Sequence, residues 1–143
     1  MRIGIKNLLF IALMLLSTGA VAESFLKIED AWVRQPPPGV SAAAAYFTIH
    51  NPSDSAYYIT GAESPMFGAV ELHETVERNG MARMVHHNFY KVPANSVFQA
   101  KPGGYHMMLF RWDAPLQEGD KIPFELKLGN GDTVPFEAIV KRP

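Results

Sequence analysis

Short segments rich in β-branched and aromatic residues alternate with clusters of Pro, Gly, Asn and Asp along the chain. This punctuation is typical of strands joined by turns in a sandwich or barrel. The pattern predicts an all-β fold of about eight or nine strands and no helix, arranged as a Greek-key β-sandwich or barrel. The predicted strands cover residues 25–33, 42–50, 57–62, 69–77, 82–88, 96–100, 105–112, 122–128 and 134–140.

The segment before Asn79-Gly80 alternates most regularly, with its apolar residues on one face and His73 on the other. Asn and Gly both tolerate the positive φ of a tight turn, so this dipeptide predicts a β-hairpin. The expected pairing sets His86 directly opposite His73. It also places Met84 on the same face as a diagonal neighbour of His73, about 7–8 Å away at the backbone.

A second pair of candidate ligands follows on a later strand. His106 and Met108 are two residues apart and share a face, whereas Met107 points to the other side. Met107 and Met66 are expected to pack in the core, as most strand methionines do. Sequence alone does not bring this second pair against the first, because only the fold determines whether the strands are neighbours.

Two imidazoles and two thioethers form a soft, neutral ligand set that suits Cu(I). The chain has no cysteine, which excludes a blue-copper electron-transfer site because that site requires a thiolate. Three further residues near the hairpin stay open as additional ligands: His86 as a spare or Cu(II) ligand, His87, and the thioether of Met81 near the hairpin tip.

The N-terminus resembles a secretory signal peptide, with Arg2 and Lys6 before a short apolar run and small residues at Ala20 and Ala22. Cleavage is expected after Ala22, leaving residues 23–143 as a single domain. The alternative is an uncleaved membrane anchor. No cysteine follows the small residues, so a lipoprotein anchor is not expected.

The expected mature chain is mildly acidic, because removal of two basic residues leaves eleven against fourteen acidic ones. It has no basic cluster of the kind that binds nucleic acid or an anionic membrane, and no membrane span is expected in it. No Ser/His/Asp or Cys/His pattern is visible, so the sequence favours a binding protein over an enzyme.

The spacing of the four candidate ligands resembles the copper-binding motif of the periplasmic copper A chaperones, the PCuAC family. Three surrounding segments are also similar to that family, and the resemblance as a whole covers nearly the whole expected mature chain. They are Ala31-Trp32-Val33-Arg34, Val70-Glu71-Leu72-His73-Glu74 and Lys101-Pro102-Gly103-Gly104-Tyr105-His106. After Met84 many members continue with Arg-Pro, where this chain has Val85-His86-His87-Asn88.

The resemblance implies a cupredoxin-like β-sandwich that binds one Cu(I) per chain through His73, Met84, His106 and Met108. It further implies a monomeric chaperone in the bacterial periplasm that carries copper to the CuA centre of cytochrome c oxidase. The recipient would be subunit II of the oxidase or another assembly chaperone. Two rival interpretations remain: a periplasmic copper scavenger or resistance protein, and a β-sandwich interaction module that binds no metal.

Overall fold

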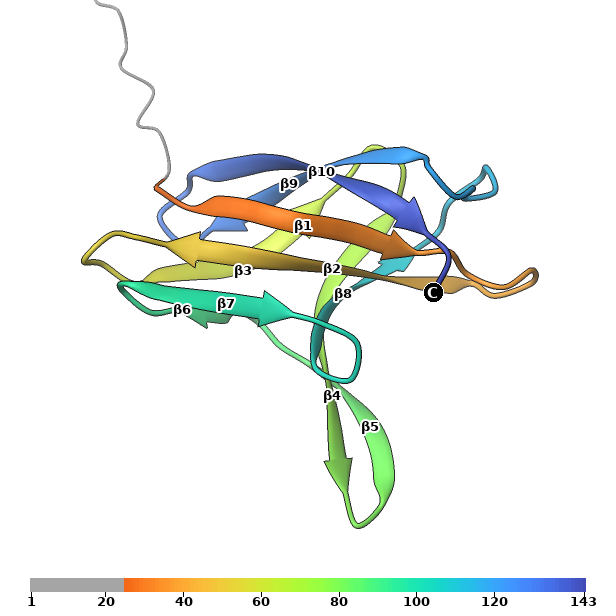
Figure 1. The fold of residues 1–143 in the computed structure, drawn as a ribbon, viewed down its shortest axis with the longest axis horizontal. Helices are drawn as coiled ribbons and strands as arrows, with labels where there is room; N and C mark the ends of the chain where they lie inside the picture. Colours follow the sequence, from red (N-terminus) through yellow and green to blue (C-terminus); the bar gives the residue numbers. More distant parts are fainter. Residues whose placement is uncertain (1–24) are drawn as a thin grey trace, which may run out of the picture.

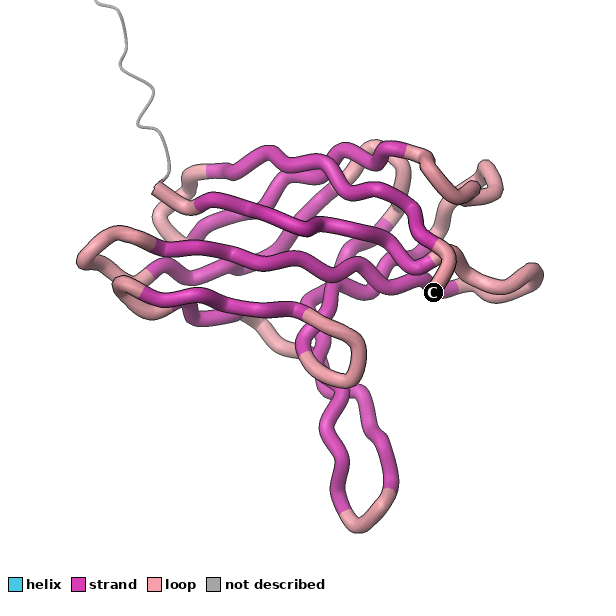
Figure 2. Tube along the Cα trace, in the orientation of Figure 1, coloured by secondary structure: helices cyan, strands magenta, loops and turns pink. Residues whose placement is uncertain are grey.

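The structure is a computed structural model that describes residues 25–143, and the predicted signal peptide over residues 1–22 lies outside these. The described residues form strands and loops, and none of them belongs to a helix that could cross a membrane (Figure 2). The strands are β1 (Lys27–Arg34), β2 (Ala42–Asn51), β3 (Tyr57–Glu63), β4 (Ala69–Arg78), β5 (Met81–His86), β6 (Tyr90–Val92), β7 (Ser96–Ala100), β8 (Tyr105–Phe110), β9 (Lys121–Leu128) and β10 (Thr133–Lys141).

The expected all-β fold is confirmed, and nine of these strands correspond to the nine predicted segments. The tenth, β6, was not predicted because three residues are too few to show alternation. Two predicted strands end earlier than expected, since β5 stops at His86 and β8 at Phe110.

The strands follow one path of hydrogen-bonded neighbours, in the order β5-β4-β8-β2-β1-β10-β9-β3-β6, and β7 pairs with the second half of β2. All pairs are antiparallel except β1 with β10. The path curls back on itself, so that β1, β2 and β7 lie in front of β3, β6 and β9 in Figure 1. This gives the two layers of a sandwich.

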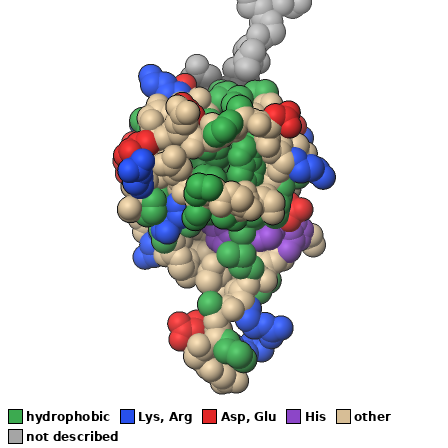
Figure 3. All heavy atoms as spheres, turned by 90° about the vertical axis from the view of Figure 1, so that its right-hand side faces the viewer, with side chains coloured by type: hydrophobic (Ala, Val, Ile, Leu, Met, Phe, Trp, Pro, Cys, Tyr) green, Lys and Arg blue, Asp and Glu red, His purple; other side chains and the backbone are tan. Residues whose placement is uncertain are grey.

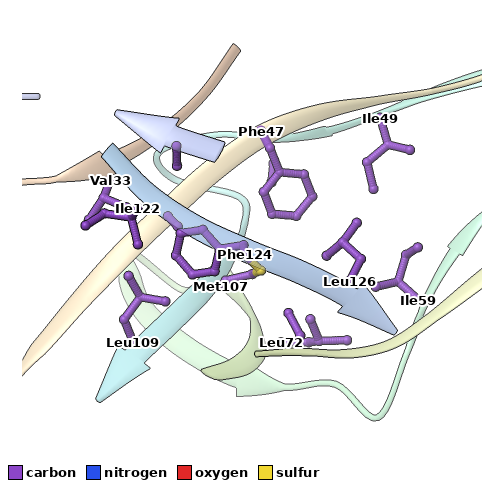
Figure 4. Packing of buried hydrophobic residues seen from close by; sticks show 14 of the residues in the cluster. Val33, Phe47, Ile49, Ile59, Leu72, Met107, Leu109, Ile122, Phe124 and Leu126 are labelled. Carbon is purple, nitrogen blue, oxygen red and sulfur yellow. The ribbon is translucent and has the colours of Figure 1, made fainter. Parts of the chain in front are cut away.

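The core fills the space between the layers with alternate side chains of the strands. Phe47 and Ile49 of β2 face Phe124 and Leu126 of β9, and all four are buried (Figure 4). Such aromatic side chains dominate the stability of a core, since truncating one to Ala costs about 3–5 kcal/mol. Met107 is fully buried there as expected, but the same expectation for Met66 is wrong, because its side chain is 41% exposed.

The β4–β5 hairpin projects from this body (Figure 1). The first half of β4 pairs with β8 up to Glu74, but the rest of β4 has only β5 beside it. Asn79 and Gly80 form the turn with φ of 55° and 74°, as the sequence predicts. Because no second layer covers the hairpin, every residue of β5 is exposed.

Candidate metal centre

The base of the hairpin places histidines from neighbouring strands side by side. The β4–β8 register sets His73 directly opposite His106, with ring centroids 5.8 Å apart. The β4–β5 register sets His73 opposite His86 on its other side, at 5.6 Å, which confirms the predicted hairpin pairing. Figure 3 shows histidine side chains gathered where the hairpin meets the body.

The two candidate methionines lie on the same face but flank the histidines from opposite directions. Met108 follows two residues after His106 and pairs with Glu71, whereas Met84 pairs with Thr75. Met108 is 9% exposed, and Met84 is 59% exposed. The structure thus brings His73 and His106 into contact, buries Met108 on the same face of the sheet, and leaves Met84 open to solvent on the hairpin.

Hydrogen bonds fix which ring nitrogen of each paired histidine is free. The Nδ1–H of His106 donates to the carbonyl of Gly104 at 3.1 Å, and the Nε2–H of His73 donates to the carboxylate of Glu71 at 2.9 Å. Carbonyl and carboxylate oxygens only accept, so the opposite nitrogens carry the lone pairs. These nitrogens, Nε2 of His106 and Nδ1 of His73, are both buried without a hydrogen-bond partner.

Such unpaired buried nitrogens are costly in an isolated protein and fit a metal ligand. A ligating histidine normally donates its other N–H to a carbonyl or carboxylate, which fixes the tautomer and the ring orientation. Gly104 and Glu71 supply this support. Sequence reasoning did not single out Glu71, although its position two residues before His73 places both side chains on one face.

Burial lowers the pKa of His106, and the neighbouring His73 lowers it further. The hydrogen bond to Gly104 acts in the opposite direction but is the weaker effect. The neutral ring, which a metal ion requires, therefore persists at a more acidic pH than in an exposed histidine.

Tyr90 supports both histidines from the core side of the sheet. Its hydroxyl contacts the backbone carbonyls of His73 and His106 as a donor, the latter at 2.8 Å. The ring packs against Phe98 and Tyr105, with centroids 5.0 and 5.1 Å away. Burial raises the pKa of Tyr90, so the hydroxyl keeps its proton and remains a donor. No sequence signal marks this residue, because the contact depends on strands that are distant along the chain.

Aromatic side chains of β2 and β1 lie beyond His106 on the side of the sheet away from the hairpin. Tyr46 lies 6.3 Å from His106 between ring centroids, and Trp32 lies 4.7 Å from Tyr46. The guanidinium of Arg34 sits over both of these rings, at 5.8 Å from Trp32 and 6.0 Å from Tyr46. This cover helps to keep water from His106, which is only 2% exposed.

The candidate donors at the base of the hairpin are imidazoles and thioethers. Within residues 25–143, no three side chains of His, Asp or Glu are close enough together to hold an ion. His87 points to the other face of the sheet, where its Nε2 lies 2.7 Å from the Glu74 carboxylate. Met84 and Met108 are the candidate further ligands for an ion between His73 and His106, and thioethers suit Cu(I) better than Zn or Mg.

The sequence model of one family, described as "Putative lipoprotein LpqE-like", matches residues 26–140. The chain belongs to this family. "Putative lipoprotein Lxx21020" of Leifsonia xyli subsp. xyli (strain CTCB07) is 33% identical over 117 residues, which cover 81% of this chain and 69% of that protein. The family relationship supports an exported protein.

Solved structures of PCuAC domains share the fold of this LpqE-like chain and confirm the resemblance to the PCuAC family. The copper-bound PCuAC domain from PmoF2 has a TM-score of 0.71 at 24% identity, covering 84% of this chain and 95% of that domain. The solution structure of CuI-DR1885 from Deinococcus radiodurans has a TM-score of 0.68 at 31% identity, covering 87% and 83%. The fold is therefore the cupredoxin-like sandwich of these domains.

Proposed function

We propose that this LpqE-like protein is a periplasmic Cu(I) metallochaperone that binds one ion per chain through His73, Met84, His106 and Met108. The observation that carries the proposal is the pair of adjacent imidazoles whose free nitrogens are buried without partners. The copper in two similar PCuAC domains supports the choice of metal. The ligand set contains no thiolate, so an acceptor with thiolate ligands can remove the ion.

The chemistry is ligand exchange, which makes the protein a carrier and not an enzyme. Glu71 and Gly104 hold the two rings with their lone pairs free, and Tyr90 holds the strands beneath them. The exposed Met84 lies on the side from which another protein can approach. We further propose that this partner is subunit II of cytochrome c oxidase, at its CuA centre, or another assembly chaperone.

Cu(I) binding is tested by anaerobic competition with bicinchoninate, combined with X-ray absorption of the loaded protein. We expect one Cu(I) per chain with both nitrogen and sulfur scatterers, and loss of binding in the double variant His106→Ala/Met108→Ala. Unchanged affinity in this double variant would contradict the proposed site.

The recipient is tested separately in a deletion strain grown at limiting copper. We expect the CuA content of the oxidase to fall and to recover with the wild-type gene but not with the double variant. Normal CuA content at limiting copper would contradict delivery to the oxidase and favour a scavenging role.

A further inference from the structure

His86 shares a sheet face with the paired histidines but, unlike them, is exposed to solvent. Its ring centroid lies 5.6 Å from that of His73, close to the 5.8 Å between His73 and His106. The three imidazoles therefore form a row across β5, β4 and β8 that runs from the surface to the buried His106. His73 is the neighbour that both pairs share.

Both spacings suit two imidazoles on one copper ion. A metal–nitrogen bond of roughly 2.0 Å places each ring centroid about 3.2 Å from the ion. Two imidazoles on one ion then have their centroids roughly 5 Å apart if the nitrogen–metal–nitrogen angle is tetrahedral, and roughly 6.4 Å apart if it is linear. In the described part of the chain no three such ligands converge as they stand. The row therefore offers two alternative pairs, His73 with His106 and His73 with His86.

The adjacent His86 and His87 differ in how free their rings are. In residues 25–143 the His86 side chain makes no hydrogen bond or ion pair, and its one ring contact is with His73. The His87 ring is held by Glu74 at 2.7 Å and packs near Tyr90 and Tyr105. Of these two histidines, only His86 can therefore bind a metal ion without breaking an existing interaction.

We propose that His86 is the transfer ligand of the copper site, an inference that rests on the proposed function. The ion would stay on Nδ1 of His73 and on Met84 while its bonds to His106 and Met108 break and a bond to His86 forms. Copper remains Cu(I) throughout, and the nitrogens that exchange carry no proton, so no electron or proton has to move. This step brings the ion from the buried end of the row to the exposed end, where ligands of an acceptor can reach it.

The test measures the rate at which the Cu(I)-loaded protein transfers its ion to bicinchoninate in an anaerobic stopped-flow experiment. His86→Ala is expected to slow transfer roughly tenfold, while the equilibrium affinity stays within about twofold of the wild type. His87→Ala is the matched control and is expected to transfer at the wild-type rate. His86→Met places a soft ligand at the same position and is expected to recover most of the rate.

Transfer by His86→Ala at the wild-type rate would overturn the transfer role, and so would an equal slowing in His87→Ala. A fall in affinity of His86→Ala as large as that of His106→Ala would also overturn it, since His86 would then be a ligand of the resting site. If the wild-type protein bound no Cu(I), the proposed function itself would fail and this inference with it.

Discussion

The two halves of the candidate copper site differ in how firmly the fold holds them. His106 and Met108 lie on β8 inside the body, at 2% and 9% exposure, and Tyr46 covers His106. Met84 lies on the uncovered hairpin and is 59% exposed. Packed side chains lose little further freedom when they bind a ligand, whereas exposed ones have to be ordered. The comparison suggests a fixed half that supplies affinity and an open half that supplies access.

The largest effect is expected from the fixed half. His106→Ala removes a pre-oriented imidazole, and we expect Cu(I) affinity to fall at least ~100-fold, because even the loss of a supporting group commonly costs 10–100-fold. Chelator competition measures the affinity, and circular dichroism checks that the fold is retained. A loss of only a few-fold would show that the buried half does not dominate binding.

The two thioethers allow a direct comparison of the halves. Met108→Ala is expected to weaken Cu(I) binding more than Met84→Ala, for which we expect roughly a tenfold loss, about 1.4 kcal/mol. The same competition assay measures both, and Met81→Ala is the control for an exposed hairpin methionine outside the ligand set. Equal losses at Met84 and Met108 would remove the distinction between the halves.

Substitution of Tyr90 tests whether its hydroxyl holds the strands that carry His73 and His106. Tyr90→Phe removes the hydroxyl that contacts the carbonyls of His73 and His106. We expect a loss of about 1 kcal/mol in the free energy of unfolding. Copper affinity should fall a few-fold, with altered imidazole chemical shifts of both histidines in NMR spectra. Tyr105→Phe changes the neighbouring ring in the same way and should leave these shifts unchanged.

The smallest effect concerns the metal-free protein at acidic pH. Below about pH 6.5 the unfolded chain protonates His106, whereas burial keeps the folded-state pKa lower, so the unfolded state binds more protons. The free energy of unfolding should therefore fall as the pH is lowered from 7.5 to 5. Urea titrations at both pH values measure this, and His106→Gln should show a smaller fall. An identical fall in the variant would assign the effect to other groups.

The hairpin was predictable because its information is local. Asn79-Gly80 specifies the turn, and alternation then fixes the faces of His73, Met84 and His86, all of which the structure shows as expected. Two-residue spacing likewise put His106 and Met108 on one face. The identity of the ligands still rests on the proposed copper site.

What the sequence could not supply are contacts between distant strands. Only the fold reveals that β8 lies beside β4, so that His106 meets His73. Tyr90 was missed for the same reason, and its strand is too short to show a pattern. Met66 shows the opposite error, because an apolar residue in a turn was expected to be buried and is exposed.

The hydrogen bond between Glu71 and His73 has a consequence for the charge of the loaded site. Imidazoles and thioethers are neutral, so Cu(I) would bring one uncompensated positive charge beside the buried His106. The Glu71 carboxylate lies 2.9 Å from the far nitrogen of His73 and supplies one negative charge. The charges of Cu(I) and the Glu71 carboxylate then cancel, whereas Cu(II) with the same carboxylate would leave one positive charge. The empty and the loaded protein would then differ by one unit of charge at the surface that a partner meets, negative when the site is empty and neutral when it holds Cu(I).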